Sequence, residues 1–311
     1  MKNNIFRVGL RLSLLAFLVP PLSLVLPLSA AFTTSHAFAD SGAARGATEK
    51  IRILYEDGVD AIGTYCMGMV ELALESIDHN YEIEVVTGEY SPARIIESVR
   101  TGELTLMWGS GDKDMEQQLL PVHIPLYKGL LGHRIMIIHP DNQYKFDQVN
   151  TLEDLQRLTF GQGTTWADTR ILEHNGLHVH RVNKYPSLFY MIDGGRFDAL
   201  PRGVQEPWSE IASRPELDLT VEQRLMLVYR MPFYLYVSHD NPQLATDLER
   251  GLRIAIADGR FDEFFFNDPT VQDVLSKAQL QNRVMIPLDN PTMSAETPVD
   301  EPELWLDINA L

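Results

Sequence analysis

Hydrophobic and polar positions along this chain follow two alternating periods. Short runs rich in β-branched and aromatic residues alternate with longer segments in which apolar residues recur every three or four positions, and these are the periods of strands and helices. Toward the N-terminus the predicted order is strand, helix, strand, helix, strand, over 51–55, 65–77, 81–86, from Pro92, and 104–108. This order predicts a parallel sheet with helices on both of its faces.

The same alternation begins again near Gly132. Strands are predicted at 133–139, 158–160, 177–182 and 197–200, and helices at 151–155, 166–174 and 187–192. Because the second series repeats the first, the sequence predicts two α/β lobes in one chain.

The C-terminal part has one predicted strand, three helical segments and a tail. A further strand is predicted at 233–238, followed by helical segments at 242–257, 261–266 and 270–277. Prolines and acidic residues dominate 291–311, which predicts an extended tail with Trp305 as its docking point.

The first 39 residues have the three parts of a secretory signal peptide. Three basic residues precede an apolar run over 12–32, and the A-x-A sequence Ala37-Phe38-Ala39 follows it. An uncleaved membrane anchor is the alternative, because the run approaches the ~20 residues that span a bilayer, but three prolines interrupt it. We expect residues 1–39 to be removed and the remainder to be exported to the periplasm.

Charge and cysteine content narrow the function classes. The chain has 43 acidic and 26 basic residues and a formal net charge of −17, whereas binding to a nucleic-acid backbone needs a basic surface. Cys66 is the single cysteine and lies in an apolar stretch, so we expect no internal disulfide and a buried packing role rather than a nucleophile.

Three stretches resemble the family-3 extracellular solute-binding proteins, the polar-amino-acid type with the type II periplasmic binding fold. The sequence Gly194-Gly195-Arg196-Phe197-Asp198-Ala199 is similar to the family's G-R-x-D-A motif at the start of a strand. Residues 233–244 are similar to its hinge strand and following helix, and 254–264 to the break between its C-terminal helices.

The resemblance implies a fold and its boundaries. Each lobe is expected to be a mainly parallel sheet flanked by helices, with a two-strand hinge between the lobes. Lobe 1 is expected at 40–133 plus 238–290, lobe 2 at 134–237, and the tail at 291–311.

The resemblance also implies a function. A monomeric protein of this family captures a small polar solute in the interlobe cleft, closes about its hinge, and delivers the solute to the membrane permease of an ABC-type importer. We expect no catalysis, cofactor, metal or nucleic acid. Two alternatives stay open: a ligand-sensing subunit for a membrane kinase or cyclase, and a periplasmic enzyme of the dehydratase or lyase type on the same fold.

Candidate ligand contacts come from position. In parallel α/β lobes, ligands meet the carboxyl ends of strands, and this rule selects Tyr55, Glu56, Trp108, Ser110, Gly163, Thr164, Thr165 and Arg202. The N–H groups at a helix start after Gly163 suit an anion, although N-capping by Thr164 or Thr165 is an equal alternative. Arg202 could clamp an anion with two N–H groups, or it could be a plain surface residue. Asp198 is expected to support the local turn.

Both halves of the family's grip on an α-amino acid are absent. Its first-lobe T-x-x-R motif is replaced by Lys113-Asp114-Met115-Glu116, and its second-lobe aspartate falls near Gly203. The identity and charge of the ligand therefore stay open.

Enzyme motifs are also absent. No G-x-S-x-G, H-E-x-x-H or Walker sequence occurs. The tightest histidine cluster, His174, His178 and His180, lacks a nearby cysteine or a helical H-x-x-x-H, so we expect it to be polar surface rather than a metal site.

Overall fold

The computed structural model describes residues 48–55 and 61–311. The predicted signal peptide, 1–39, and the candidate contact Glu56 lie outside the described residues. None of the described helices is long and apolar enough to cross a membrane.

The first sheet has the strand order β2-β1-β3-β11-β4. Its strands are β1 (Glu49–Leu54), β2 (Tyr81–Val86), β3 (Leu106–Ser110), β4 (Leu120–Val122) and β11 (Phe233–Val237). β1 runs parallel to β2 and β3, whereas β11 runs antiparallel to β3 and β4. β11 therefore joins a sheet whose other four strands precede it by more than a hundred residues.

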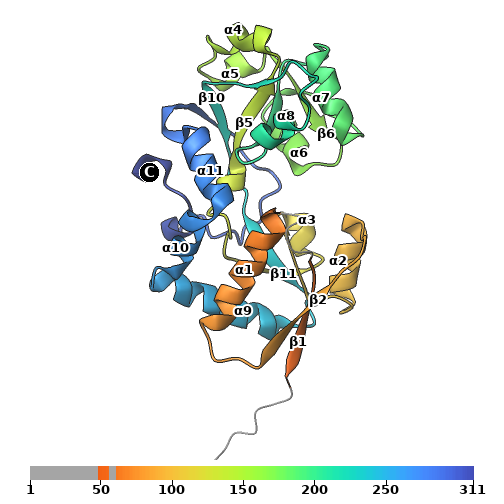
Figure 1. Cartoon of the computed structure of the whole chain (residues 1–311), viewed down its shortest axis with the longest axis vertical. Helices are drawn as coiled ribbons and strands as arrows, with labels where there is room; N and C mark the ends of the chain where they lie inside the picture. Colours follow the sequence, from red (N-terminus) through yellow and green to blue (C-terminus); the bar gives the residue numbers. More distant parts are fainter. Residues whose placement is uncertain (1–47, 56–60) are drawn as a thin grey trace, which may run out of the picture. The chain divides into compact units, whose positions relative to one another are not determined.

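Helices near both ends of the described chain pack around this sheet. They are α1 (Ala61–Glu75), α2 (Pro92–Arg100), α3 (Lys113–Glu116), α9 (Pro242–Ala257), α10 (Arg260–Asn267) and α11 (Pro269–Lys277). α1 and α9 lie side by side (Figure 1), and their backbones meet at Gly251, where a Cβ atom would lie 2.0 Å from the Ala73 carbonyl oxygen. Cys66 on α1 is buried, as predicted. We call this sheet with these helices the first lobe.

The second sheet has the order β12-β10-β5-β8, and a short strand also pairs with β5. The members are β5 (His133–Ile138), β8 (Leu200–Gly203), β9 (Thr220–Val221), β10 (Leu225–Val228) and β12 (Val284–Pro287). All six residues of β5 are buried, which is typical of a central strand covered on both faces.

A parallel pair of strands extends this region. β6 (Thr159–Gly163) pairs with β7 (His178–Val182), and an isolated bridge joins Phe160 to Ala199, just before β8. The surrounding helices are α4 (Gln143–Phe146), α5 (Leu152–Leu155), α6 (Ala167–His174), α7 (Tyr185–Asp193) and α8 (Pro207–Ala212). We call these strands and helices the second lobe (Figure 1).

The predicted two-lobed α/β fold is confirmed, but strand direction in the second sheet differs from the expectation. β5 is antiparallel to both β8 and β10, so the sheet is mixed rather than mainly parallel. Neighbouring parallel strands need long crossover connections. The alternation of strands and helices in the sequence indicates such crossovers, but it does not indicate which strands pair with each other.

The chain passes between the two sheets more often than a two-strand hinge requires. Besides the connections β4 to β5 and β10 to β11, it passes from α11 into β12 and then returns in the tail to the first lobe. β12 thus pairs in the second sheet although 238–290 is predicted for lobe 1, and β11 pairs in the first sheet although 134–237 is predicted for lobe 2. The lobe boundaries themselves stay a proposal.

The first two connections touch at a glycine. A Cβ atom on Gly132 would lie 1.9 Å from the Tyr229 carbonyl oxygen, and the Tyr229 N–H donates to the Gly132 carbonyl at 3.0 Å. Only a residue without a side chain fits at position 132, where the β4–β5 connection approaches the β10–β11 connection.

The tail docks as predicted. Trp305 is 5% exposed, and its ring lies so close to Gly129 that a Cβ atom there would be 2.5 Å away. The Trp305 indole N–H donates to the Pro298 carbonyl at 2.9 Å, and Arg230 stacks over the ring at 4.5 Å. Five short 3₁₀ helices complete the described chain: η1 (Leu130–Gly132), η2 (Pro140–Asn142), η3 (Leu280–Asn282), η4 (Pro302–Leu304) and η5 (Ile308–Ala310).

Candidate ligand-binding site between the two sheets

A cavity of about 370 Å³ is bounded by residues of both lobes. Its apolar and small lining residues are Ile62, Ser110, Leu131, Trp166, Ala167, Met231 and Phe233, and its charged or amide-bearing lining residues are Arg134, Asp168, Arg202, Gln205 and Glu206. Apolar walls with a few converging polar groups are typical of small-molecule sites.

Strand ends supply much of this lining. Ser110 is the last residue of β3, Trp166 to Asp168 follow β6 at the start of α6, and Gln205 and Glu206 follow β8. The carboxyl ends of strands thus meet at the cavity, as expected for ligand sites in α/β folds.

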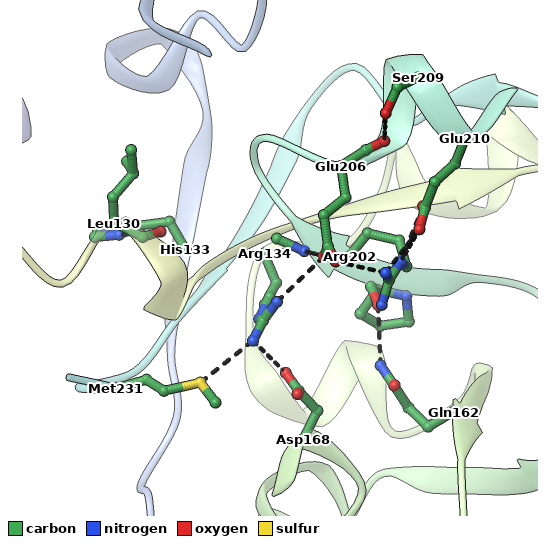
Figure 2. Close-up of polar contacts among 12 residues, drawn as sticks. Leu130, His133, Arg134, Gln162, Asp168, Arg202, Glu206, Ser209, Glu210 and Met231 are labelled. Atoms are coloured by element: carbon green, nitrogen blue, oxygen red, sulfur yellow. Dashed lines mark hydrogen bonds and ion pairs between the residues drawn. The ribbon is translucent and has the colours of Figure 1, made fainter. Parts of the chain in front are cut away.

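Arg134 is a buried charge with acidic partners on both sides of its guanidinium (Figure 2). One Nη lies 2.9 Å from an Asp168 carboxylate oxygen, and the other lies 3.6 Å from Glu206. Its Nε donates to the Tyr229 hydroxyl at 2.8 Å, and that hydroxyl donates to Asp168. Burial by itself lowers the pKa of Arg134, but the negative charge of Asp168 and its other partners holds the pKa above its ordinary value.

Arg202 is also buried, and its Nε and one Nη are bonded to acidic partners. Its guanidinium donates to Glu210 at 2.7 and 2.9 Å and to Glu206 at 2.5 Å, and it stacks over the Trp166 ring at 4.7 Å. The bidentate pairing with Glu210 fixes the plane of the guanidinium. Arg202 is therefore not a plain surface arginine, and its positive charge is already paired with the carboxylates of Glu206 and Glu210.

The cluster as a whole carries excess negative charge. Two guanidinium groups, Arg134 and Arg202, face three carboxylates, Asp168, Glu206 and Glu210. Burial raises the pKa of Glu206, although both arginines act in the opposite direction. Burial therefore disfavours the charged form of the Glu206 carboxylate.

The Glu206 carboxylate also lies against Gly203, at which the sequence has no acidic side chain. Its carboxylate accepts the Gly203 N–H at 2.6 Å, and a Cβ atom on Gly203 would lie 2.9 Å from both Glu206 Oε2 and Arg134 Nη1. The position of the family's second-lobe aspartate falls near Gly203, where the sequence has no acid. The carboxylate beside Gly203 belongs to Glu206, three residues further along the chain.

The start of α6 is not capped by Thr164 or Thr165, which was one of the two predicted alternatives. Its N-cap residue is Trp166, which makes no side-chain cap hydrogen bond. The Thr164 hydroxyl donates instead to the Asn183 amide oxygen at 2.7 Å, and Thr165 is exposed. Asp168 in the first turn already places a negative charge at this helix end.

The predicted contacts divide into two groups. Ser110 and Arg202 line the cavity. Tyr55, Trp108, Gly163, Thr164 and Thr165 do not: Trp108 packs against the first-lobe core, and the Gly163 carbonyl accepts the Thr169 hydroxyl at 2.7 Å.

Sequence reasoning missed Arg134, Asp168 and Glu206. A signal for Arg134 was present, because it is the one permanently charged residue in the apolar run 133–139, and a charge in a buried strand needs partners. Asp168 and Glu206 carry no comparable signal, since acidic residues near helix starts are common.

The stretch that replaces the family's T-x-x-R motif forms ion pairs with an arginine of the second lobe. Lys113-Asp114-Met115-Glu116 forms α3, whose N-cap is Asp112. Arg170 of α6 contacts Asp114 at 2.8 Å and Asp112 at 3.4 Å. These ion pairs join the two lobes.

A larger surface depression of about 660 Å³ lies elsewhere, among α8, β9, α11 and η3. Its cations have partners: Lys277 pairs with Asp273, and Arg283 donates to the carbonyls of Glu222 and Leu225. It lacks the converging acidic and basic side chains of the smaller cavity.

Other predictions can be located too. Asp198 supports its turn as expected, accepting the Thr159 N–H at 2.9 Å and pairing with Lys145 at 2.6 Å. His178 and His180 are exposed on β7, and they belong to no potential metal-binding group among the described residues.

Comparison with known proteins bears on the fold. No family model matches the chain, and no curated protein sequence matches it. A probable amino-acid ABC transporter extracellular-binding protein from Bacillus subtilis matches with a TM-score of 0.51 and 14% identity, over 72% of this chain and 99% of that one.

Two further solved structures match with lower scores. An ancestral arginine-binding protein bound to glutamine has a TM-score of 0.49 and 15% identity, over 71% of this chain and 98% of that one. An ancestral amino acid-binding protein, a precursor of cyclohexadienyl dehydratase, has a TM-score of 0.46 and 13% identity, over 71% and 94%. The chain thus has the two-lobed α/β fold of the extracellular binding protein from Bacillus subtilis.

Proposed function

We propose that this protein captures a small polar solute in the cavity between its lobes and serves an ABC-type importer in the periplasm. One observation carries the proposal. Residues of both lobes bound the same cavity, and charged groups of the second lobe converge on it. A solute in this position contacts both lobes at once, so its binding energy favours the closed arrangement.

The charge balance selects among solutes. Since Arg134 and Arg202 are each paired with carboxylates, a purely anionic ligand meets no unpaired cation in the cluster. A ligand with an ammonium or guanidinium group compensates the excess negative charge instead. We therefore propose a cationic or zwitterionic solute, with Glu206 as its main acidic contact and the Trp166 and Phe233 rings as walls.

The remaining parts of the proposal rest on sequence. Export depends on the signal peptide at 1–39, and delivery requires a membrane permease. A sensory subunit or a periplasmic enzyme would use the same cavity, and only the enzyme would alter the ligand chemically.

The first test is a thermal-shift screen of the purified protein against amino acids, polyamines, organic acids and sugars. A ligand at a hundred times its Kd stabilises the fold by about 2.7 kcal/mol. We expect shifts among basic or zwitterionic compounds and none among simple anions. Silence across all four classes would contradict solute capture, and a bound compound recovered chemically altered would indicate an enzyme.

A variant then tests the site. Glu206→Gln removes the carboxylate and keeps a similar shape, and we expect about 10-fold weaker binding of a cationic ligand by calorimetry, because hydrogen bonds to charged groups are among the stronger ones. Glu216→Gln, which alters an exposed carboxylate of the same lobe bonded to the Tyr190 hydroxyl, is the matched control. Equal affinity in both variants would place the ligand elsewhere.

A further inference from the structure

His139, Asp193 and Asp218 bring their side chains together at the end of β5 that is remote from the cavity. One ligand atom from each, a ring nitrogen and two carboxylate oxygens, lies within 4.8 Å of the other two. His139 follows the last residue of β5, whereas Arg134 is near its start. The five steps along the chain from Arg134 to His139 span roughly 16 Å in a strand, so this cluster is separate from the proposed solute site.

The backbone holds the three residues in place. β9 pairs with β5 through Ile138 and Thr220, which brings the segment before β9 next to His139. Asp193 is the last residue of α7, and its carboxylate accepts the Asp218 N–H at 2.8 Å. Strand pairing and the bond to the Asp193 carboxylate thus hold three separate segments around one point.

The two carboxylates lack a neutralising cation. Within the described residues, no lysine or arginine lies within 4.0 Å of Asp193 or Asp218, although most other carboxylates of this lobe that are partly buried have such a partner. Adjacent like charges are unfavourable, and a bound cation between them removes that repulsion.

We propose that His139, Asp193 and Asp218 form a divalent metal site that takes Zn²⁺. One imidazole nitrogen with two carboxylate oxygens is a donor set that Zn²⁺ accepts, and water completes the coordination when three protein ligands are present. His139 is partly exposed and Asp218 is exposed, which leaves room for that water.

The His139 ring changes tautomer when it binds the metal. Nδ1 of His139 accepts the Asp141 N–H at 3.2 Å, so in the metal-free neutral ring Nε2 carries the proton. Nε2 has no hydrogen-bond partner among the described residues and is the nitrogen we assign to the metal. Its coordination moves the proton to Nδ1 and breaks the bond from the Asp141 N–H, and the Asp141 carboxylate, 3.7 Å from Nδ1, replaces it as the partner, as carboxylates next to metal-binding histidines do.

The test uses untagged, chelator-treated protein titrated with Zn²⁺. We expect one Zn²⁺ per chain by native mass spectrometry and a rise in Tm on saturation. Asp218→Asn and His139→Ala each abolish the stoichiometric binding. Asp141→Asn weakens it by about 10- to 100-fold, the range for residues that orient a ligand.

The exposed histidines of β7 are the control. The double variant His178→Ala/His180→Ala removes two histidines from the same lobe and leaves the proposed ligands intact, so we expect unchanged Zn²⁺ binding. The proposal is overturned if the unaltered protein takes up no Zn²⁺, or if Asp218→Asn retains the metal while the β7 double variant loses it.

Discussion

His133 is a buried histidine at the point where the chain passes from the first lobe into β5. Burial lowers its pKa to about 4, although hydrogen bonds from Nδ1 to the Leu130 and Gly129 carbonyls act in the opposite direction. Between pH 6.5, the ordinary pKa of a histidine, and about pH 4, His133 is therefore protonated in the unfolded chain but remains neutral in the folded chain.

This proton makes stability depend on pH. The folded state binds fewer protons between pH 6.5 and about 4, so its stability is lost as the pH falls through that window. We expect His133 to contribute about 2 kcal/mol of loss between pH 7 and pH 5. Urea unfolding of His133→Gln at the two pH values should show a correspondingly smaller loss, whereas His178→Gln, at an exposed site, should behave like the unaltered protein. An undiminished loss in His133→Gln would show that other groups cause it.

Prediction from sequence worked for single residues whose role is local. Asp198 supports its own turn and Trp305 anchors the tail, because motif and composition already indicate such roles. Arg134 acts through Asp168, Glu206 and Tyr229, which lie 34 to 95 residues away. Nothing in a single sequence brings those residues together, and the candidate site was therefore predicted only at Ser110 and Arg202.

At the scale of elements, the contact between the two connecting segments sets a strict size limit. Gly132 leaves no room for a side chain beside the Tyr229 carbonyl. We expect Gly132→Ala to destabilise the fold by about 3 kcal/mol, the upper range for overpacking, as measured by urea unfolding. Gly109→Ala is the control, because its Cβ atom would meet only ordinary contacts at 3.8 Å or more. Similar costs at both positions would argue against the close approach.

Long elements were predicted more accurately than short ones. α9 has the predicted bounds of 242–257, and α6 and α7 differ by one or two residues. The strands β4, β9, β10 and β12 were missed, as were the short helices α3, α4 and α8. The missed strands have four residues or fewer, too short to show a period, and each is ordered by strands from distant parts of the chain.

At the scale of the whole molecule, Arg170 connects the lobes outside the cavity. Its ion pairs with Asp112 and Asp114 are partly exposed, and such pairs contribute about 0.2–1 kcal/mol. We expect Arg170→Gln to favour the open arrangement, to increase the radius of gyration in X-ray scattering, and to weaken solute binding by about two- to fivefold.

Salt dependence separates this effect from a change in packing. At 1 M salt the screening length is about 3 Å, so the unaltered protein and Arg170→Gln should converge. Arg181→Gln breaks a comparable pair with Glu173 inside the second lobe and should leave the radius of gyration unchanged. A difference between Arg170→Gln and the unaltered protein that persists in high salt would rule out the electrostatic explanation.

The placement of β11 and β12 has a consequence for synthesis. The first sheet needs residues 233–237 between β3 and β4, and the second sheet needs residues 284–287 at its edge. Neither sheet can be completed while the ribosome is still translating the middle of the chain. Translation of that part takes on the order of ten seconds or more at about 5–20 residues per second. During that interval the earlier strands have unpaired edges, so a nascent chain of this topology depends on a chaperone or on rapid transfer to an export channel more than a protein whose sheets form from consecutive strands.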